Sequence, residues 1–239
     1  FLDITPNEPL FYNLFRMRNI GLFCNCLDLL RDVSYYRKES ALILLTDRVQ
    51  NEILSFNYKS EKEIMMHVYE VITNVAMILP SFALKIAGSQ LFIPTVPPDE
   101  HHQREKLWKD TLIAYMCVIS KIDQIGEGKE EGIERIQKMI PSILYQLNQI
   151  LEYSEASLSL KKIALEFFFT LCVFNNGLFF SQISTNFDIL GFIVQGMHLE
   201  PFELGSLIVR VILLCVRHLL LPRDSAIGFI EDILESIGT

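Results

Sequence analysis

The sequence carries little positive charge. Its 239 residues include 21 lysines and arginines against 29 acidic residues, so the formal net charge is −8 at pH 7. A protein that binds nucleic acid on its own needs a face rich in lysine and arginine to neutralise the phosphates. We therefore expect little or no direct nucleic acid binding by this chain.

The sequence also lacks the common motifs of catalysis and metal binding. It contains neither G-x-S-x-G nor H-E-x-x-H. The segment Asp99–His102 offers ligand atoms, but a metal site needs three or four converging ligands, so a solvated loop is the favoured interpretation. His67 and His218 lie in apolar stretches without a nucleophile motif, which favours core or groove histidines. We expect no cofactor, metal or enzyme activity; a pocket with two or more converging titratable groups would reopen the enzyme alternative.

Cysteines are few and odd in number. Five cysteines in a long apolar chain suit buried free thiols in a reducing compartment better than a disulfide framework. The chain starts at Phe1 and shows no secretory signal, so we interpret it as an excised fragment whose targeting signals are not seen. We expect an intracellular location.

Apolar residues make up half of the chain, and the longest uncharged run is Phe167–Phe187, with seven phenylalanines. A membrane-spanning helix needs about 20 predominantly apolar residues. Here Asn175, Asn176 and Gly177 interrupt the run, and such residues favour left-handed backbone and helix ends. The run therefore predicts a buried helix that ends near Phe174, a turn, and a shorter second helix.

Other apolar stretches predict helices rather than strands, because their apolar residues do not alternate strictly with polar ones. The longest of these stretches cover residues 64–79, 111–122 and 207–221, and each stops at a proline or at glycines. Shorter apolar helices are expected at residues 41–54, 140–151, 187–196 and 226–237. The predicted fold class is all-α.

A small residue recurs in the middle of the strongest predicted helices, at an average interval of about 47 residues: Cys26, Ala76, Cys117, Cys172 and Cys215. Armadillo and HEAT repeats have periods of about 40–47 residues, and their helical hairpins bury their apolar faces only by stacking. The pattern predicts one armadillo/HEAT-like domain over residues 1–239. In this domain about five repeats form a right-handed superhelix, with exposed loops near 93–106 and 126–132.

Candidate partner-contact residues come from aromatic and polar positions outside the repeating apolar pattern. The segment Tyr35–Glu39 combines tyrosines with charges at a predicted link between helices, a composition enriched at interfaces. The helix around residues 7–19 is too apolar to stand alone, so it caps the repeats or docks on a partner. The candidates are Phe11, Tyr12, Phe15, Tyr35, Tyr36, Arg37, Asn74 and Trp108.

Two helical-repeat families were compared with these segments. Importin-like armadillo proteins read peptides with rows of asparagines and tryptophans, but here only Asn74 falls at a matching position and Trp108 is the only tryptophan, which disfavours an import receptor. The order of the segments resembles the C-terminal helical-repeat core of the ARID-bearing scaffold subunit of SWI/SNF-type chromatin remodellers. The segments that carry this resemblance are Arg16–Tyr36, Glu70–Leu79, Ser159–Val194 and Leu204–Leu234.

This resemblance covers most of the chain in hydrophobic pattern. It implies a nuclear, non-catalytic scaffold subunit that organises the core module of the remodeller in transcription regulation. It also implies that the partners are other protein subunits and that the ATPase lies in another chain. Two alternatives stay open: an armadillo/HEAT adaptor of another complex, in transport or genome maintenance, and a membrane-peripheral helical protein that binds lipid.

Overall fold

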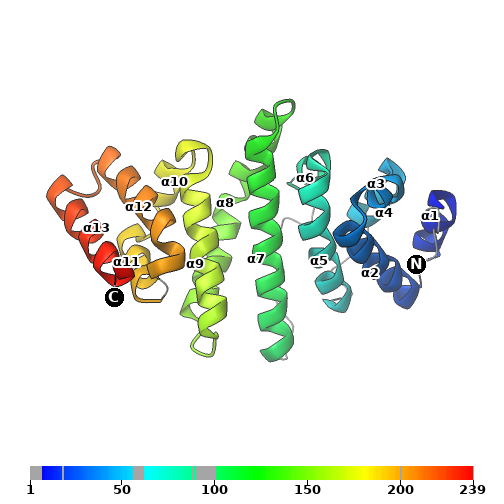
Figure 1. Cartoon of the computed structure of the whole chain (residues 1–239), viewed down its shortest axis with the longest axis horizontal. Coiled ribbons are helices and arrows are strands. Elements are labelled where there is room, and N and C mark those ends of the chain that lie inside the picture. Colours follow the sequence, from blue (N-terminus) through cyan, green and yellow to red (C-terminus); the bar gives the residue numbers. More distant parts are fainter. Residues whose placement is uncertain are drawn as a thin grey trace. The chain divides into compact units, whose positions relative to one another are not determined.

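The computed structural model describes residues 7–17, 19–55, 62–87, 89, 101–199 and 201–238, apart from the side chains of residues 62, 63, 101–104, 201, 237 and 238. Within these ranges the chain forms thirteen α-helices and one short 3₁₀ helix, with no strand (Figure 1). The predicted all-α class is therefore confirmed. The chain divides into two compact units, residues 1–139 and 140–239, and the boundary falls inside one helix next to Pro141.

Unit 1 is built around α5, which packs against both α2 and α7 (Figure 1, blue to green). Asn7 and Asn19 cap the first two helices, because their side-chain oxygens accept hydrogen bonds from the backbone N–H groups of Leu10 and Leu22. The helices are α1 Glu8–Arg16, α2 Ile20–Tyr36, α3 Lys38–Leu44, α4 Asp47–Ser55, α5 Lys62–Ile78, α6 Pro80–Ala87, α7 His101–Gln124 and the first part of α8 Lys129–Glu152.

The helix predicted at residues 41–54 is wrong, because α3 and α4 are separate helices. Leu45 leaves the helical conformation, with φ −83° and ψ 45°. The side-chain amide of Gln50 donates to the freed Leu45 carbonyl over 2.6 Å, and the Thr46 hydroxyl donates to Glu8 over 2.8 Å. These local side-chain bonds compensate for the interrupted helix.

Parts of both predicted loops are helical. Residues 101–106 form the first turns of α7, and residues 93–100 lie outside the described part of the chain. In the second loop only 126–128 precede α8, which starts at Lys129. Gly132 is buried in the first turn of α8, where a Cβ atom would lie 2.7 Å from Leu84 Cδ2. Close packing against Leu84, rather than a turn, accounts for this glycine.

Unit 2 is centred on α12, which packs against α9, α11 and α13 (Figure 1, yellow to red). Phe168 lies at the centre of its aromatic cluster, with ring centroids 4.7 Å from Phe192 and 5.7 Å from Phe169. Besides the last part of α8, the helices are α9 Leu158–Val173, the 3₁₀ helix Phe174–Asn176, α10 Phe180–Ser184, α11 Ile189–Leu199, α12 Pro201–Arg217 and α13 Arg223–Gly238.

The phenylalanine run folds as predicted, into a buried helix, a turn and a short helix. After α9, three consecutive residues adopt left-handed backbone: Asn175 (φ 44°), Asn176 (φ 59°) and Gly177 (φ 82°). Asparagine and glycine tolerate this conformation better than other residues. Among the described helices, none combines the length and apolar character that crossing a bilayer requires.

The helix predicted at residues 207–221 ends earlier, at Arg217. Leu219 has a left-handed φ of 59°, and the backbone N–H of Leu220 donates to the Cys215 carbonyl over 2.8 Å, while that of Leu219 donates to Val216 over 3.1 Å. These two bonds form a Schellman motif with leucine where glycine is usual. The stop therefore comes from this motif, before Pro222 is reached.

The recurring small residues lie on the helices that contact each other in chain order. In unit 1 they lie on α2, α5 and α7, and in unit 2 on α9 and α12. Cys26, Ala76, Cys172 and Cys215 are buried, and Cys117 is half-buried. All five cysteines are free thiols, and burial raises the pKa of Cys172 and brings that of Cys215 to about 11.

Candidate functional site

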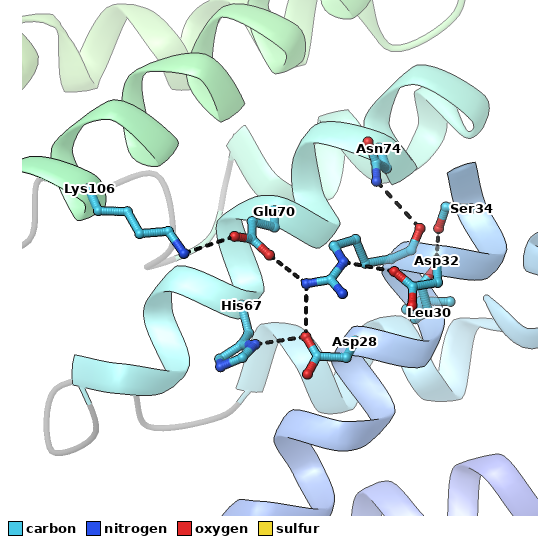
Figure 2. Close-up of polar contacts among 9 residues, drawn as sticks. Asp28, Leu30, Asp32, Ser34, His67, Glu70, Asn74 and Lys106 are labelled. Atoms are coloured by element: carbon cyan, nitrogen blue, oxygen red, sulfur yellow. Dashed lines mark hydrogen bonds and ion pairs between the residues drawn. The ribbon is translucent and has the colours of Figure 1, made fainter. Parts of the chain in front are cut away.

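A cluster of polar side chains lies across α2, α5 and α7 in unit 1 (Figure 2). On each helix the residues lie three, four or seven positions after the first of them, which places them on one helix face. The cluster, which we call the unit 1 network, consists of Asp28, Arg31 and Asp32 on α2, His67, Glu70 and Asn74 on α5, and Lys106 and Asp110 on α7.

Arg31 is the centre of this network. Its Nη1 lies 2.7 Å from Glu70 Oε2 and 3.1 Å from Asp28 Oδ1, and its Nε lies 2.9 Å from Asp32 Oδ1. Figure 2 marks these contacts as dashed lines to the labelled carboxylates of Asp28, Asp32 and Glu70. A planar guanidinium with several donors suits such multiple pairing better than a lysine ammonium. Arg31 therefore joins α2 to α5 through its bond to Glu70.

Two further contacts extend the network on either side of Arg31. Lys106 Nζ lies 3.2 Å from Glu70 Oε1, which connects α5 to α7. His67 Nδ1 lies 2.8 Å from Asp28 Oδ1. Burial alone would raise the pKa of Glu70, but the hydrogen bonds from Arg31 and Lys106 outweigh it and hold this pKa below its usual value. Glu70 is thus a carboxylate whose charge is matched within the chain.

Asp110 borders a small pocket of about 210 Å³ beside the network, lined also by Arg31, Glu70, Thr73 and Asn74. Its Oδ2 atom is buried and accepts no hydrogen bond from the residues that the structure describes. Burial raises the pKa of Asp110 to about 6, an effect that Glu70 strengthens and Lys106 opposes. At neutral pH this carboxyl group is therefore a strong, unused acceptor at the wall of a polar pocket.

Three titratable groups, Arg31, Glu70 and Asp110, converge on this pocket, which meets the condition that keeps the enzyme alternative open. Ligand pockets usually have volumes of roughly 300–1,000 Å³, so this one admits a side chain or an ion rather than a substrate. Arg31 and Glu70 are paired, and the Thr73 hydroxyl donates to the Tyr69 carbonyl over 2.9 Å. Among the described residues that line the pocket there is no serine, cysteine, lysine or histidine that a neighbouring base could activate. Within the described ranges, no three metal-ligating side chains gather; the side chains of Asp99–His102 lie outside these ranges.

Asn74 is the predicted contact residue that the structure brings to this pocket. Its side-chain amide donates to the Arg31 carbonyl over 3.4 Å. Tyr35, Tyr36 and Arg37 lie at the end of α2, where the sequence predicted a link between helices. The two tyrosines are 68% and 78% exposed, with ring centroids 4.8 Å apart, and Arg37 is exposed as well.

Other predicted contact residues are used inside unit 1. Phe11 and Phe15 are buried, with ring centroids 5.0 Å apart, and Trp108 is buried on α7. Tyr12 is half-buried between the guanidinium groups of Arg16 and Arg48, at 5.7 and 5.9 Å from its ring centroid. The side chains of Phe11, Phe15 and Trp108 therefore contribute to the core rather than to a surface open to partners.

Sequence reasoning missed Arg31, Glu70 and Asp110. The spacing of His67, Glu70 and Asn74 indicates a polar stripe on one face of α5. That stripe does not show which residues of α2 and α7 lie opposite, because the register between helices is set by their packed apolar faces.

No protein-family model matches the chain, and comparisons with curated proteins and with solved structures find no match either. The resemblance to a chromatin-remodeller scaffold therefore rests on the residue pattern alone.

Proposed function

We propose that this chain is a non-catalytic scaffold that organises a multiprotein assembly. From the sequence resemblance, we propose that the assembly is the core module of a SWI/SNF-type chromatin remodelling complex in the nucleus, acting in transcription regulation. Its partners would be other protein subunits.

The observation that carries this proposal is the contact order of the helices with recurring small residues. The contacts run from α2 to α5 to α7 in unit 1, and from α9 to α12 in unit 2. Successive packing of equivalent helices is the building principle of repeat proteins, whose extended surfaces bind partners. It supports the finer proposal that about five hairpins form a right-handed superhelix.

Small-angle X-ray scattering of the purified chain tests this architecture. A compact globule of this length has a radius of gyration of about 18 Å. A superhelix of stacked hairpins is elongated, so we expect a clearly larger value and an asymmetric distance distribution. A value at the globular limit would remove the superhelix, and with it the main support for a scaffold.

Tyr35, Tyr36 and Arg37 are the surface that we propose contacts a partner. Tyrosine and arginine are enriched among the residues that dominate binding energy, and these three are exposed. In the described part of the chain, Arg37 makes no ion pair. Ordering the Arg37 side chain at an interface would therefore break no ion pair among the described residues.

Affinity purification of the tagged chain from cells, with quantitative mass spectrometry, tests the function. We expect remodeller subunits, including the ATPase, to co-purify with the wild type and to be depleted with the double variant Tyr35→Ala, Tyr36→Ala. Tyr145→Ala is the matched control, because this tyrosine is also 65% exposed but lies on α8. If transport or genome-maintenance factors co-purify instead, the chain is an adaptor of another complex. If the purified chain floats with liposomes, the result favours the lipid-binding alternative.

A further inference from the structure

Unit 2 contains a larger pocket, of about 640 Å³, between the turn after α9 and one face of α12. Asn175 and Asn176 contribute the turn side of this pocket, and Arg210, Leu213, Arg217 and His218 contribute the helix side. We call it the α12 pocket. It lies entirely within unit 2, and the scaffold proposal above does not use it.

The backbone of the turn rests directly on α12, which fixes the shape of the pocket. Gly177 has a φ of 82°, and a Cβ atom there would lie 2.6 Å from Leu214 Cδ2. The Phe174 carbonyl accepts hydrogen bonds from Gly177 and Leu178, over 3.0 and 3.1 Å. Because the turn is held by these bonds and by close contact with α12, both walls are preorganised.

The helix side of the pocket has a basic–apolar–basic pattern. Arg210, Leu213, Leu214 and Arg217 follow the spacing i, i+3, i+4, i+7, so they lie on one face of α12. Seven residues of helix rise by about 10 Å, which separates the two arginines by two turns. Leu213, between them, is 56% exposed.

The two arginines of this pocket have no acidic partner among the residues that the structure describes. Arg210 and Arg217 are exposed, and neither makes an ion pair or a side-chain hydrogen bond in the part of the chain that the structure describes. None of the described residues that line the pocket is acidic. This is a local feature of a chain whose net charge is −8.

Asn175 and Asn176 add neutral hydrogen-bonding groups to the opposite wall. Within the described residues, neither side-chain amide makes a hydrogen bond. An asparagine amide offers one acceptor and two donors, the same types of group that a peptide backbone presents. The two left-handed asparagines therefore place peptide-like groups opposite the arginines.

We propose that the α12 pocket binds an acidic, partly apolar peptide segment of a partner protein. Two carboxylates about 10 Å apart would pair with Arg210 and Arg217, and an apolar side chain between them would cover Leu213. The asparagine amides would bind the backbone of the segment. An exposed leucine between the arginines favours a peptide over a phosphate backbone, which gains nothing from apolar contact. This inference goes beyond the scaffold proposal, because it concerns a different unit and does not depend on which complex is organised.

Fluorescence anisotropy with the purified full chain tests the proposal. The probe is a fluorescein-labelled peptide, Gly-Ser-Glu-Ser-Leu-Ser-Glu-Gly, whose two glutamates and central leucine lie on one face when the peptide is extended. Its glutamate Cα atoms are then about 13 Å apart, so their flexible side chains can reach two arginines about 10 Å apart. The control peptide carries glutamine in place of both glutamates. We expect saturable binding of the acidic peptide, and binding of the control weaker by about tenfold or more, because truncating one partner of a close charge pair costs about that much.

Charge reversal in the protein completes the test. Arg210→Glu and Arg217→Glu should each weaken binding about tenfold or more. Arg223→Glu is the matched control, because it changes the net charge equally at an exposed arginine outside the pocket. Circular dichroism checks that all variants keep their helices.

The proposal would be overturned by no binding of the acidic peptide, by equal binding of the glutamine peptide, or by equal loss of binding with Arg223→Glu. Tighter binding of a single-stranded oligonucleotide than of the peptide would also overturn it, in favour of a nucleic acid. The assay uses purified components, so its failure leaves the co-purification test of the scaffold function unaffected.

Discussion

In unit 1, Arg31 contacts three carboxylates, whereas in unit 2 Arg210 and Arg217 contact none in the described part of the chain. Both sites are built in the same way, from side chains three, four or seven positions apart on packed helices. In unit 1 the charges face neighbouring helices and connect them, while in unit 2 they face an open pocket. The site whose arginine is paired with carboxylates of the chain holds helices together. The site whose arginines lack such partners is available to a ligand.

Asp110 is the exception in unit 1, because its buried Oδ2 atom has no hydrogen-bond partner among the described residues. Replacing Asp110 should have the largest effect on stability. The pKa of Asp110 is raised to about 6, so folding favours the protonated form. The contribution of Asp110 to the free energy of unfolding is highest below the pKa that this residue has in the unfolded chain. It falls as the pH rises from about 4 to about 6. At pH 7.5, Asp110→Asn should stabilise unit 1 by about 2 kcal/mol, after allowance for solvent screening of a half-buried group.

Urea denaturation followed by tryptophan fluorescence measures this effect, because Trp108, the only tryptophan, reports on unit 1. The gain should be smaller at pH 5, where the folded wild type is mostly protonated. A gain of the same size at both pH values would show that ionisation of Asp110 is not its cause.

The turn of the α12 pocket can be broken at Gly177. Gly177→Ala should destabilise unit 2 by about 2 kcal/mol, because a side chain at a φ of 82° is strained and its Cβ would contact Leu214. Gly228 is the matched control. It lies inside α13 with open space around it, so Gly228→Ala should stabilise the same unit by up to about 1 kcal/mol.

Urea denaturation followed by far-UV circular dichroism checks the opposite signs of this pair. Gly177→Ala should also weaken peptide binding, whereas Gly228→Ala should leave it unchanged. If both variants destabilise unit 2, the loss caused by Gly177→Ala would reflect a general sensitivity of this unit to glycine substitution rather than strain in the turn.

The smallest expected effects come from replacing one arginine that is paired with carboxylates and one that is not. Arg31→Ala should destabilise unit 1 by about 1–2 kcal/mol, since three carboxylates lose their shared partner, although partial exposure of these groups reduces the cost. Arg217→Ala should change the stability of unit 2 by less than about 0.5 kcal/mol, because no bond within the described chain is lost.

Denaturant midpoints of the two variants, measured beside the wild type, decide this comparison. Equal destabilisation by both would remove the distinction between compensated and uncompensated sites. Added salt should narrow the difference between Arg31→Ala and the wild type, because the pairs are partly exposed.

The sequence predicts the helices well where long apolar runs end at strong stop signals. The break after Phe174 follows directly from Asn175, Asn176 and Gly177, residues that favour left-handed backbone. The ends of α3 and α12 were missed because they depend on Gln50 bonding to a backbone carbonyl and on Leu219 in a conformation that leucine rarely adopts. Neither leaves a signal in residue type.

The candidate sites were much less predictable. Asn74 was singled out and lies at the unit 1 pocket, but Phe11, Phe15 and Trp108 are buried. Composition alone does not show whether an aromatic ring faces the core or a partner. Arg210 and Arg217 lie seven residues apart, which predicts that they share a helix face. The sequence does not show which residues lie opposite them, because that depends on the packing of the turn against α12.

The buried thiols of unit 2 have a chemical consequence. Cysteine reacts as the thiolate, and burial keeps Cys172 and Cys215 in the protonated form at physiological pH. Oxidants and alkylating agents should therefore react slowly with these two thiols while α9 and α12 remain packed together. All five cysteines are free thiols, and the sulfur atoms of Cys172 and Cys215 become nucleophiles only when α9 and α12 separate.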